Sequence, residues 1–254
     1  MLFSIVTASY NSGDEIRKTY NSLLLQNHEI FEWIIVDGGS EAYSCGVLQE
    51  LVKSAPFAVQ YVSEADDGVF DAFNKGLKIA CGKWIGFLGC GDEYYPGVLE
   101  SIANSIGNAD DHEVVYGIID FVRQDGAHYW YTTDEKYLDE GRMMHHAATF
   151  VKKDMYVEIG GFNIKYKSAS DLDAFIKLKR AGARFAFVPY IVTKFNAGGL
   201  STTGTLPYEE RMEIMHEYGM LTKKMWIRFI IGKRLKKLRT SIKNFRIGTH
   251  NERL

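Results

Sequence analysis

Cysteine, proline and long apolar runs are all scarce in this chain of 254 residues. Its three cysteines, Cys45, Cys81 and Cys90, form no CxxC pattern, which argues against a disulfide framework or a zinc cluster and favours a reducing cytosol. Only four prolines, against 46% hydrophobic and 13% aromatic residues, exclude a disordered chain. No apolar run approaches the roughly 20 residues that span a bilayer. The first residues lack a basic stretch before an apolar one, so we expect no signal peptide.

Charge is present but unevenly distributed. The formal net charge is −2, yet residues 1–222 hold 19 basic and 31 acidic side chains, whereas residues 223–254 hold 11 basic and one acidic. The acidic body excludes a general nucleic-acid-binding surface, and no recognised nucleic-acid module accompanies the basic run, so we expect no nucleic-acid partner. We therefore divide the chain into a globular domain, 1–222, and a basic tail, 223–254.

Apolar runs alternate with helical spacing in the first half of the chain. The helical segment 68–80, for example, places Val69, Phe73 and Leu77 on one face. Continuous apolar strands between amphipathic helices are typical of a mostly parallel sheet covered on both faces, so we predict an α/β fold. The apolar runs predict strands at 2–8, 31–36, 57–62 and 84–88.

The second half is less regular. We predict strands at 114–122 and 128–131, possible antiparallel partners, and a further strand at 185–188. Residues 194–205, with three glycines, are predicted to form a loop. The helical spacing predicts helices at 154–159, 171–181 and 207–221.

Polar clusters follow the predicted strands where each strand ends, and in an open parallel sheet ligands bind outside these carboxyl ends. An aspartate there accepts hydrogen bonds from a base or ribose, or offers a hard oxygen ligand to Mg²⁺ or Mn²⁺ on a diphosphate. Neither GxxxxGK[ST] nor GxGxxG is present, so we expect a nucleotide site without a phosphate-binding glycine loop. The clusters are Thr7, Ser9 and Tyr10, then Asp37, then residues 64–71, then Asp92.

Six motifs stand in a fixed order: SIVTASYNSGDE, IIVDGGS, YVSEADDGVFDAFNKGLKIACGKWIGFLGCGDEYYP, HHAATFVKKDMYVEIGGF, SASDLDAFIKL and NAGGLSTT. This ordered set, over about residues 3–205, resembles family 2 glycosyltransferases with a GT-A (Rossmann-like) fold. The branch it is most similar to is that of bacterial enzymes of colanic-acid, O-antigen (lipopolysaccharide) or capsule polysaccharide biosynthesis. The resemblance implies transfer of one sugar, with inversion, from a nucleotide-diphospho-sugar donor to a glycan acceptor.

The resemblance also implies a role for particular residues. Asp92 matches the last acidic position of the metal motif and implies an Mn²⁺ or Mg²⁺ cofactor, and Asp171 matches the general base. A base is needed because a sugar hydroxyl is too weak an acid to ionise at neutral pH. His146 matches a position near the diphosphate or acceptor, and Gly199 and Ser201 match a loop that closes over the donor. The implied donor-binding residues are Thr7, Ser9, Tyr10, Asp37, Asp66, Asp71, Asn74, Lys75 and Gly91.

The chain departs from the family pattern at several positions. Gly89 and Gly91 stand where many members carry a carboxylate or Asn, and Ala147 stands where Gln is usual. Asp92 is then the only side-chain metal ligand unless the neighbouring Glu93 substitutes, which predicts weak metal binding. These departures motivate a second hypothesis, a nucleotide-sugar-binding protein of the same fold with little or no turnover. A nucleotidyltransferase would need a basic glycine-rich triphosphate loop, which is not evident.

Structural interpretations stand beside the functional ones. Asp37 after a strand is compatible with an Asx-turn, and Asp92 with a helix N-cap ahead of Pro96. Asp171 and Asp173 are both placed to cap the following helix, and either is a possible base, with Asp171 the preferred one.

The tail combines an apolar stripe with many cations. A basic amphipathic helix of this kind lies in an anionic membrane interface, or it packs on the acidic body. We favour the membrane, because a lipid-linked acceptor also places the enzyme there, and expect a cytoplasmic protein that is peripheral on the inner membrane. The stripe consists of Ile227, Ile231, Leu235, Leu238, Ile242 and Phe245.

Overall fold

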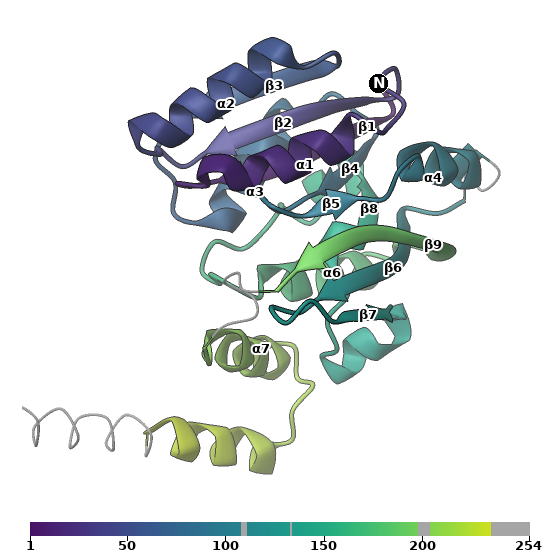
Figure 1. Cartoon of the computed structure of the whole chain (residues 1–254). Helices are drawn as coiled ribbons and strands as arrows, with labels where there is room; N and C mark the ends of the chain where they lie inside the picture. The colour runs from purple at the N-terminus through teal and green to yellow at the C-terminus, as the bar shows by residue number, and fades with distance from the viewer. Residues whose placement is uncertain (108–110, 133, 198–203, 235–254) are drawn as a thin grey trace, which may run out of the picture. The chain divides into compact units, whose positions relative to one another are not determined.

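The computed structural model describes residues 1–107, 111–132, 134–197 and 204–234 (Figure 1). The chain divides into two compact units, Met1–Pro207 and Tyr208–Leu254. All predicted site residues belong to the first unit. We describe each unit by itself.

One sheet organises the first unit, with the strand order β3-β2-β1-β4-β8-β6-β9-β5, and β7 pairs with β6 beside this path. β3, β2, β1 and β4 are parallel, β8 is antiparallel to β4 and to β6, and β9 is parallel to β6. The carboxyl ends of β1, β2, β4, β6 and β9 therefore meet the amino end of β8 at one edge. The strands are β1 Phe3–Ser9, β2 Phe31–Asp37, β3 Ala58–Ser63, β4 Trp84–Phe87, β5 Glu93–Tyr94, β6 Val114–Val122, β7 His128–Tyr131, β8 Thr149–Lys152 and β9 Phe185–Asn196.

Helices cover both faces of this sheet. On one face, Ile16 and Leu23 of α1 and Leu48 of α2 join the core cluster that contains Ile5 and Trp33. On the other face α3 approaches β1 so closely that a Cβ at Gly76 would lie 2.4 Å from Val6. The helices of this unit are α1 Ile16–Leu23, α2 Ala42–Ser54, α3 Val69–Ile79, α4 Val98–Gly107, α5 Lys153–Glu158 and α6 Ser170–Arg180, with short 3₁₀ turns η1 Gly13–Glu15, η2 Glu135–Glu140 and η3 His146–Ala148.

An aromatic cluster on the α3 face lies directly behind the edge described above. The rings of Phe73 and Phe87 are 4.3 Å apart, and those of Phe87 and Phe162 are 5.1 Å apart. Phe73 also contacts the ring of His146 edge-on at 5.7 Å. Aromatic packing of this kind holds side chains in one rotamer. The cluster therefore provides a rigid surface against which the His146 ring packs.

The observed elements confirm most of the predicted ones, and β6 and β7 have the predicted bounds and pair antiparallel. The predicted loop at 194–205 was wrong at its start, because β9 continues from Phe185 to Asn196. Pairing with β6 as far as Val122 and with β5 at Glu93 supports this longer strand. The short strands β5 and β8 were not predicted.

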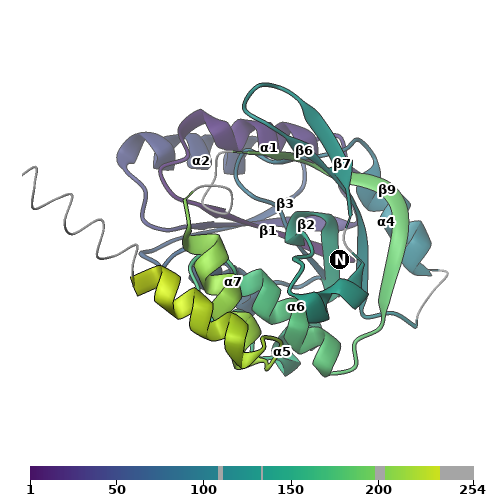
Figure 2. The same cartoon turned by 90° about the horizontal axis from the view of Figure 1, so that it is seen from below.

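The second unit contains α7, Leu206–Glu217, which begins just before the unit boundary, and a helical segment at 223–234 that lies beside it (Figures 1 and 2). The rings of His216 and Trp226 stack at 3.8 Å, and Phe229 contacts Tyr208 at 6.0 Å. Lys233 pairs with Glu209 and Glu213 at 3.1 and 2.9 Å. Among the described residues, no helix has both the length and the apolar character needed to cross a bilayer.

Candidate active site

The sheet edge gathers most of the predicted residues. Ser9 at the end of β1 lies in register with Asp37 at the end of β2, and Asp37 with Ser63 at the end of β3. Asp92 follows β4, and His146 precedes β8. The arrangement is the one expected when parallel strands deliver their carboxyl ends to one crevice.

Asp37 is buried and its carboxylate already has partners. It accepts hydrogen bonds from the backbone N–H of Ser40 at 3.0 Å, from the Ser40 hydroxyl, and from the Ser63 hydroxyl at 2.7 Å. These contacts join the loops after β2 and β3. These three bonds leave acceptor capacity on the carboxylate, and recognition of a base by Asp37 stays a prediction.

The residues after β1 differ in their surroundings. Thr7 is buried below the edge, where its hydroxyl accepts a hydrogen bond from Trp33 Nε1 at 2.9 Å. Ser9 is also buried and bonds the Ser12 hydroxyl at 2.9 Å, whereas Tyr10 is 69% exposed. Ser9 and Tyr10 therefore lie at the edge itself, while Thr7 supports it from the core.

Lys75 ties the loop after β3 to α3. Its Nζ donates to the carbonyl of Ala65 at 2.7 Å and lies 3.1 Å from Glu64 and 3.3 Å from Asp71. Burial works to raise the pKa of Asp71, but the backbone N–H of Asp67 and the Lys75 ammonium outweigh it and hold that pKa below its usual value. Lys75 and Asp71 thus bind each other and the neighbouring loop, as expected of residues whose role is structural.

Asp66 and Asn74 complete the predicted donor stretch. Asp66 accepts from the backbone of Gly68 at 2.9 Å, and a Cβ at Gly38 would lie 2.6 Å from its carboxylate, so this loop touches the loop after β2. Asn74 donates to the carbonyl of Phe162 at 2.9 Å and accepts from its N–H at 2.8 Å. Asp66 faces the edge, whereas Asn74 is fully engaged with the segment before α6.

The turn after β4 is held in place from two sides. The Thr19 hydroxyl donates to the carbonyl of Asp92 at 2.9 Å and accepts from the N–H of Gly91 at 3.0 Å. Asn196, at the end of β9, donates its backbone N–H to Asp92 Oδ1 at 3.0 Å and its amide to the carbonyl of Gly91 at 2.8 Å. A Cβ at Gly89 would lie 2.5 Å from Asp92 Oδ2. This glycine therefore makes room for the Asp92 carboxylate.

Asp92 is the buried carboxylate of this turn. Burial raises its pKa to about 7, against the lowering effects of the Asn196 N–H and of His146. Oδ2 has no hydrogen-bond donor among the described residues. Within the described part of the chain, no three His, Cys, Asp or Glu side chains gather into a metal cage. Asp92 is thus a single buried carboxylate at this turn and not part of a cage among the described residues.

Asp171 and His146 form a polar pair at the same sheet edge. Asp171 lies in the first turn of α6, is buried, and accepts from His146 Nδ1 at 3.1 Å and from the backbone of Leu172 at 2.9 Å. Asp173 is instead paired with Lys177 at 2.7 Å. Only Asp171 of the two therefore faces the histidine, and His146 lies close enough to Asp92 to influence its pKa.

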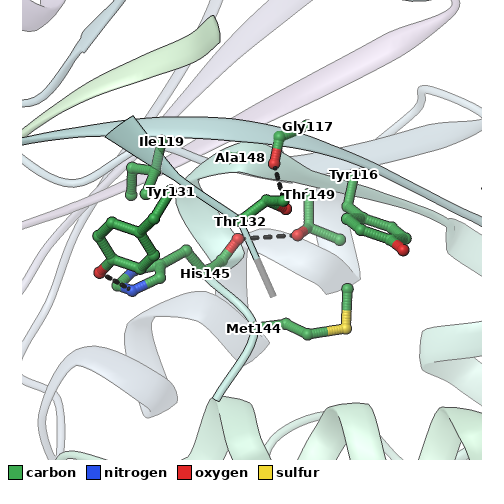
Figure 3. Close-up of a pocket in the computed structure, with 9 residues that line it drawn as sticks. All are labelled: Tyr116, Gly117, Ile119, Tyr131, Thr132, Met144, His145, Ala148 and Thr149. Carbon is green, nitrogen blue, oxygen red and sulfur yellow. Dashed lines mark hydrogen bonds between the residues drawn. The ribbon is translucent and has the colours of Figure 1, made fainter. Parts of the chain in front are cut away.

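A small pocket lies between β6, β7 and η3, and His145, the neighbour of His146 in the sequence, lines it (Figure 3). The Tyr131 hydroxyl meets His145 Nε2 there, and the Thr132 hydroxyl donates to the carbonyl of Gly117 at 2.9 Å. Burial, followed by the neighbouring His146, lowers the pKa of His145 to about 4. His145 is therefore neutral at physiological pH and supports the turn that presents His146. Gly199 and Ser201 lie outside the described residues.

Three contributors were missed at the sequence level. Thr19 lies in the middle of a helix, and Asn196 stands in a segment that was predicted to be a loop, yet both position Asp92. Ser63 ends β3 and bonds Asp37. A polar residue at the carboxyl end of a strand was a usable signal for Ser63 and Asn196, whereas nothing in the sequence distinguishes Thr19.

A mostly parallel sheet covered by helices, with acidic side chains at its carboxyl edge, is a GT-A (Rossmann-like) arrangement. The sequence model for "Glycosyl transferase family 2" matches residues 4–171, and the chain therefore belongs to this family. The GT-A fold and the bacterial branch expected from the sequence agree with the proteins that the chain resembles.

Sequence relatives are themselves glycosyltransferases. A "PGL/p-HBAD biosynthesis glycosyltransferase" of Mycobacterium bovis is 28% identical over 205 residues, which is 80% of each chain. An uncharacterized glycosyltransferase, YibD of Escherichia coli, is 28% identical over 127 residues, covering 50% of this chain and 36% of YibD.

Solved structures share the fold. S. aureus TarS 1–349 in complex with UDP-GlcNAc has a TM-score of 0.67 at 18% identity, covering 85% of this chain and 64% of that one. The mannosyltransferase PcManGT of Pyrobaculum calidifontis, in complex with GDP-Man and Mn²⁺, has a TM-score of 0.65 at 15% identity, covering 87% and 65%. The chain spans 42% of the longer TarS chain that it also matches.

Proposed function

We propose that this family 2 glycosyltransferase transfers one sugar, with inversion, from a nucleotide-diphospho-sugar to a lipid-linked glycan in bacterial surface polysaccharide synthesis. The observation that supports it most is the pair of buried carboxylates, Asp92 and Asp171, at one sheet edge with His146 near both. An inverting displacement needs one carboxylate on the acceptor side and one on the leaving-group side.

In the proposed step an acceptor oxygen forms a bond to the anomeric carbon while the bond from that carbon to the diphosphate oxygen breaks. Asp171 takes the acceptor proton, and the nucleoside diphosphate leaves with the electron pair. His146 holds Asp171 Oδ2 at 3.1 Å and so acts as a positioning residue for the base. No covalent intermediate on the protein is required.

The donor side of the proposal rests on Asp92. Its buried carboxylate and available Oδ2 suit Mn²⁺ or Mg²⁺, hard cations that bind oxygen. The cation would offset the charge that gathers on the departing diphosphate. PcManGT, which shares the fold, was solved with Mn²⁺ together with its donor GDP-Man, and this supports the same choice of cation here.

The second hypothesis, a nucleotide-sugar-binding protein with weak or no catalysis, rested on Gly89 and Gly91. The close approach of Gly89 to Asp92 Oδ2 gives this glycine a packing role, and the positive φ of 89° gives Gly91 a backbone role. Each glycine therefore has a structural reason of its own and need not mark the loss of a metal-binding side chain. An active enzyme is the better supported proposal.

Replacing the base tests the proposal. Asp171→Asn should retain binding of the donor, measured by thermal shift with nucleotide sugars and Mn²⁺, and reduce transfer by a factor of at least ~10², the lower end of general base contributions. Asp173→Asn is the matched control, because Asp173 pairs with Lys177, and it should keep most of its turnover. Undiminished transfer by Asp171→Asn would overturn the base assignment, and donor binding without transfer in the unaltered protein would favour the second hypothesis.

A further inference from the structure

Strand β7 exposes every one of its four side chains. Tyr129, Trp130 and Tyr131 are 49%, 67% and 38% exposed. A single exposed aromatic is ordinary, but several on one edge strand are a concentration of the residues that anchor interfaces. The hairpin of β6 and β7 also projects from the sheet (Figure 2).

The two faces of this hairpin have different surroundings. Tyr131 contacts Phe121 at 6.3 Å and bonds His145, so it packs against the body. Trp130 lies opposite Asp120 in the antiparallel register, and side chains opposite each other share a face. His128, two residues earlier, shares that face as well.

A buried carboxylate fixes His128. Asp120 is fully buried and accepts from the Tyr95 hydroxyl at 2.7 Å and from His128 Nδ1 at 2.8 Å. The His128 side chain is nevertheless 49% exposed. With Nδ1 held by the carboxylate, Nε2 is the nitrogen left for a ligand. A positioned polar group thus lies next to a flat, exposed indole ring.

The hairpin adjoins both halves of the candidate active site. Asp120 is in register with Lys194, and Lys194 with Glu93, the neighbour of Asp92. Tyr131 bonds His145, the neighbour of His146. A long acceptor that enters the edge therefore passes within reach of β7.

We propose that Trp130 and His128 bind a pyranose ring of the acceptor glycan, away from the sugar that carries the attacking hydroxyl. The proposal rests on the proposed glycosyltransferase activity. A sugar presents a C–H face that stacks on an indole and hydroxyls that bond an imidazole at its rim. An anionic lipid surface is a poorer occupant, because Asp120 lies under this face and Arg123 is paired with Asp125 at 3.1 Å.

The indole N–H of Trp130 supplies a direct reporter. Trp33 and Trp84 are buried and Trp226 stacks on His216 in the second unit, so ¹⁵N-tryptophan NMR of the full chain should separate the exposed signal, assigned by its absence in Trp130→Phe. We expect saturable shifts of this signal with at least one of cellotetraose, chitotetraose and mannotetraose. An unmoved signal with all three would overturn the proposal.

A matched pair of variants sharpens the experiment. His128→Asn, whose amide can still donate to Asp120 but has no atom at the Nε2 position, should weaken the affinity read from the Trp130 signal about fivefold, the value of one hydrogen bond. Tyr129→Ala, an exposed aromatic on the opposite face, should leave it unchanged. Equal effects of the two would also contradict the proposal. Absence of donor binding in the unaltered protein would instead overturn the proposed function itself.

Discussion

Some residues of this site have structural hydrogen bonds as well as a predicted role in binding, and Asp37 is an example. The sequence predicted an aspartate at the end of the second strand and the structure has it there, buried among hydroxyl donors. Its Ser63 partner stands 26 residues away and follows from strand register alone. The positions of acidic residues were therefore predictable from strand ends, while their hydrogen-bond partners depended on three-dimensional pairing.

Asn74 allows the supporting role to be tested. Its amide makes two hydrogen bonds to the backbone of Phe162, so Asn74→Ala leaves a backbone N–H and carbonyl without their partner. We expect a loss of about 1–3 kcal/mol in the free energy of unfolding, measured by urea denaturation, with donor affinity unchanged. Lower donor affinity at unchanged stability would instead support the role implied by the family resemblance.

At the level of elements, the first four strands follow from their apolar runs, whereas β5, β8 and the end of β9 do not. β5 has only two residues and β8 four, too few to show a period. β9 carries Thr193 and Lys194, polar residues that pair with β5 and β6 instead of entering a loop. Strands stabilised by distant partners are the ones that local sequence predicts least well.

An ion pair at the start of β6 links three of these elements and makes their stability depend on pH. Arg184, which directly precedes β9, donates two side-chain hydrogen bonds to Glu113, at 2.8 and 3.1 Å. Lys152 of β8 lies 3.5 Å from the same carboxylate. Hydrogen bonding from Arg184, opposed by burial, lowers the pKa of Glu113 to about 2. The lowered pKa means that this contribution is present above the ordinary glutamate value and is lost as pH falls through about 2.

Glu113→Gln should therefore lower the free energy of unfolding by about 1–3 kcal/mol at neutral pH and by progressively less in acid. Urea denaturation from pH 7 down to pH 3 measures this. Glu140→Gln is a matched control, because its pair with Arg142 is exposed and should contribute little. A deficit in Glu113→Gln that stays constant over the whole range would contradict the linkage.

On the scale of the whole molecule, the basic tail predicted from charge belongs to a unit that has its own packing. We propose that this unit attaches the enzyme to an anionic membrane at the cytoplasmic face of the inner membrane. Phe229 is buried and its ring contacts those of Trp226 and Tyr208, while Ile227 and Ile231 are 47% and 52% exposed. Lys223, Lys224, Arg228 and Arg234 surround these two isoleucines on the same exposed surface. The rest of the apolar stripe, from Leu235 on, lies outside the described residues.

Vesicle flotation tests this attachment. The full chain should float with vesicles that contain phosphatidylglycerol and less with neutral ones, because each cation near an anionic surface adds about 1 kcal/mol. Ile227→Ser with Ile231→Ser should weaken flotation while leaving the aromatic contacts of the unit intact, and deletion of 223–254 should abolish it. Flotation that survives the deletion would refute the membrane role.

The pairing of β4 with β8 has a consequence for how such enzymes diversify. Apart from His146, Gly199 and Ser201, the residues assigned to the donor come from the first 92 positions, whereas Asp171 and the proposed acceptor residues His128 and Trp130 come from later ones. The two segments meet in the sheet at the β4–β8 seam, where Gly86 pairs with Phe150. A Cβ at Gly86 would lie 2.8 Å from the Phe150 ring. We expect recombination between relatives that keeps this glycine–phenylalanine pair to exchange the proposed acceptor residues together, because they all follow Gly86 in the sequence.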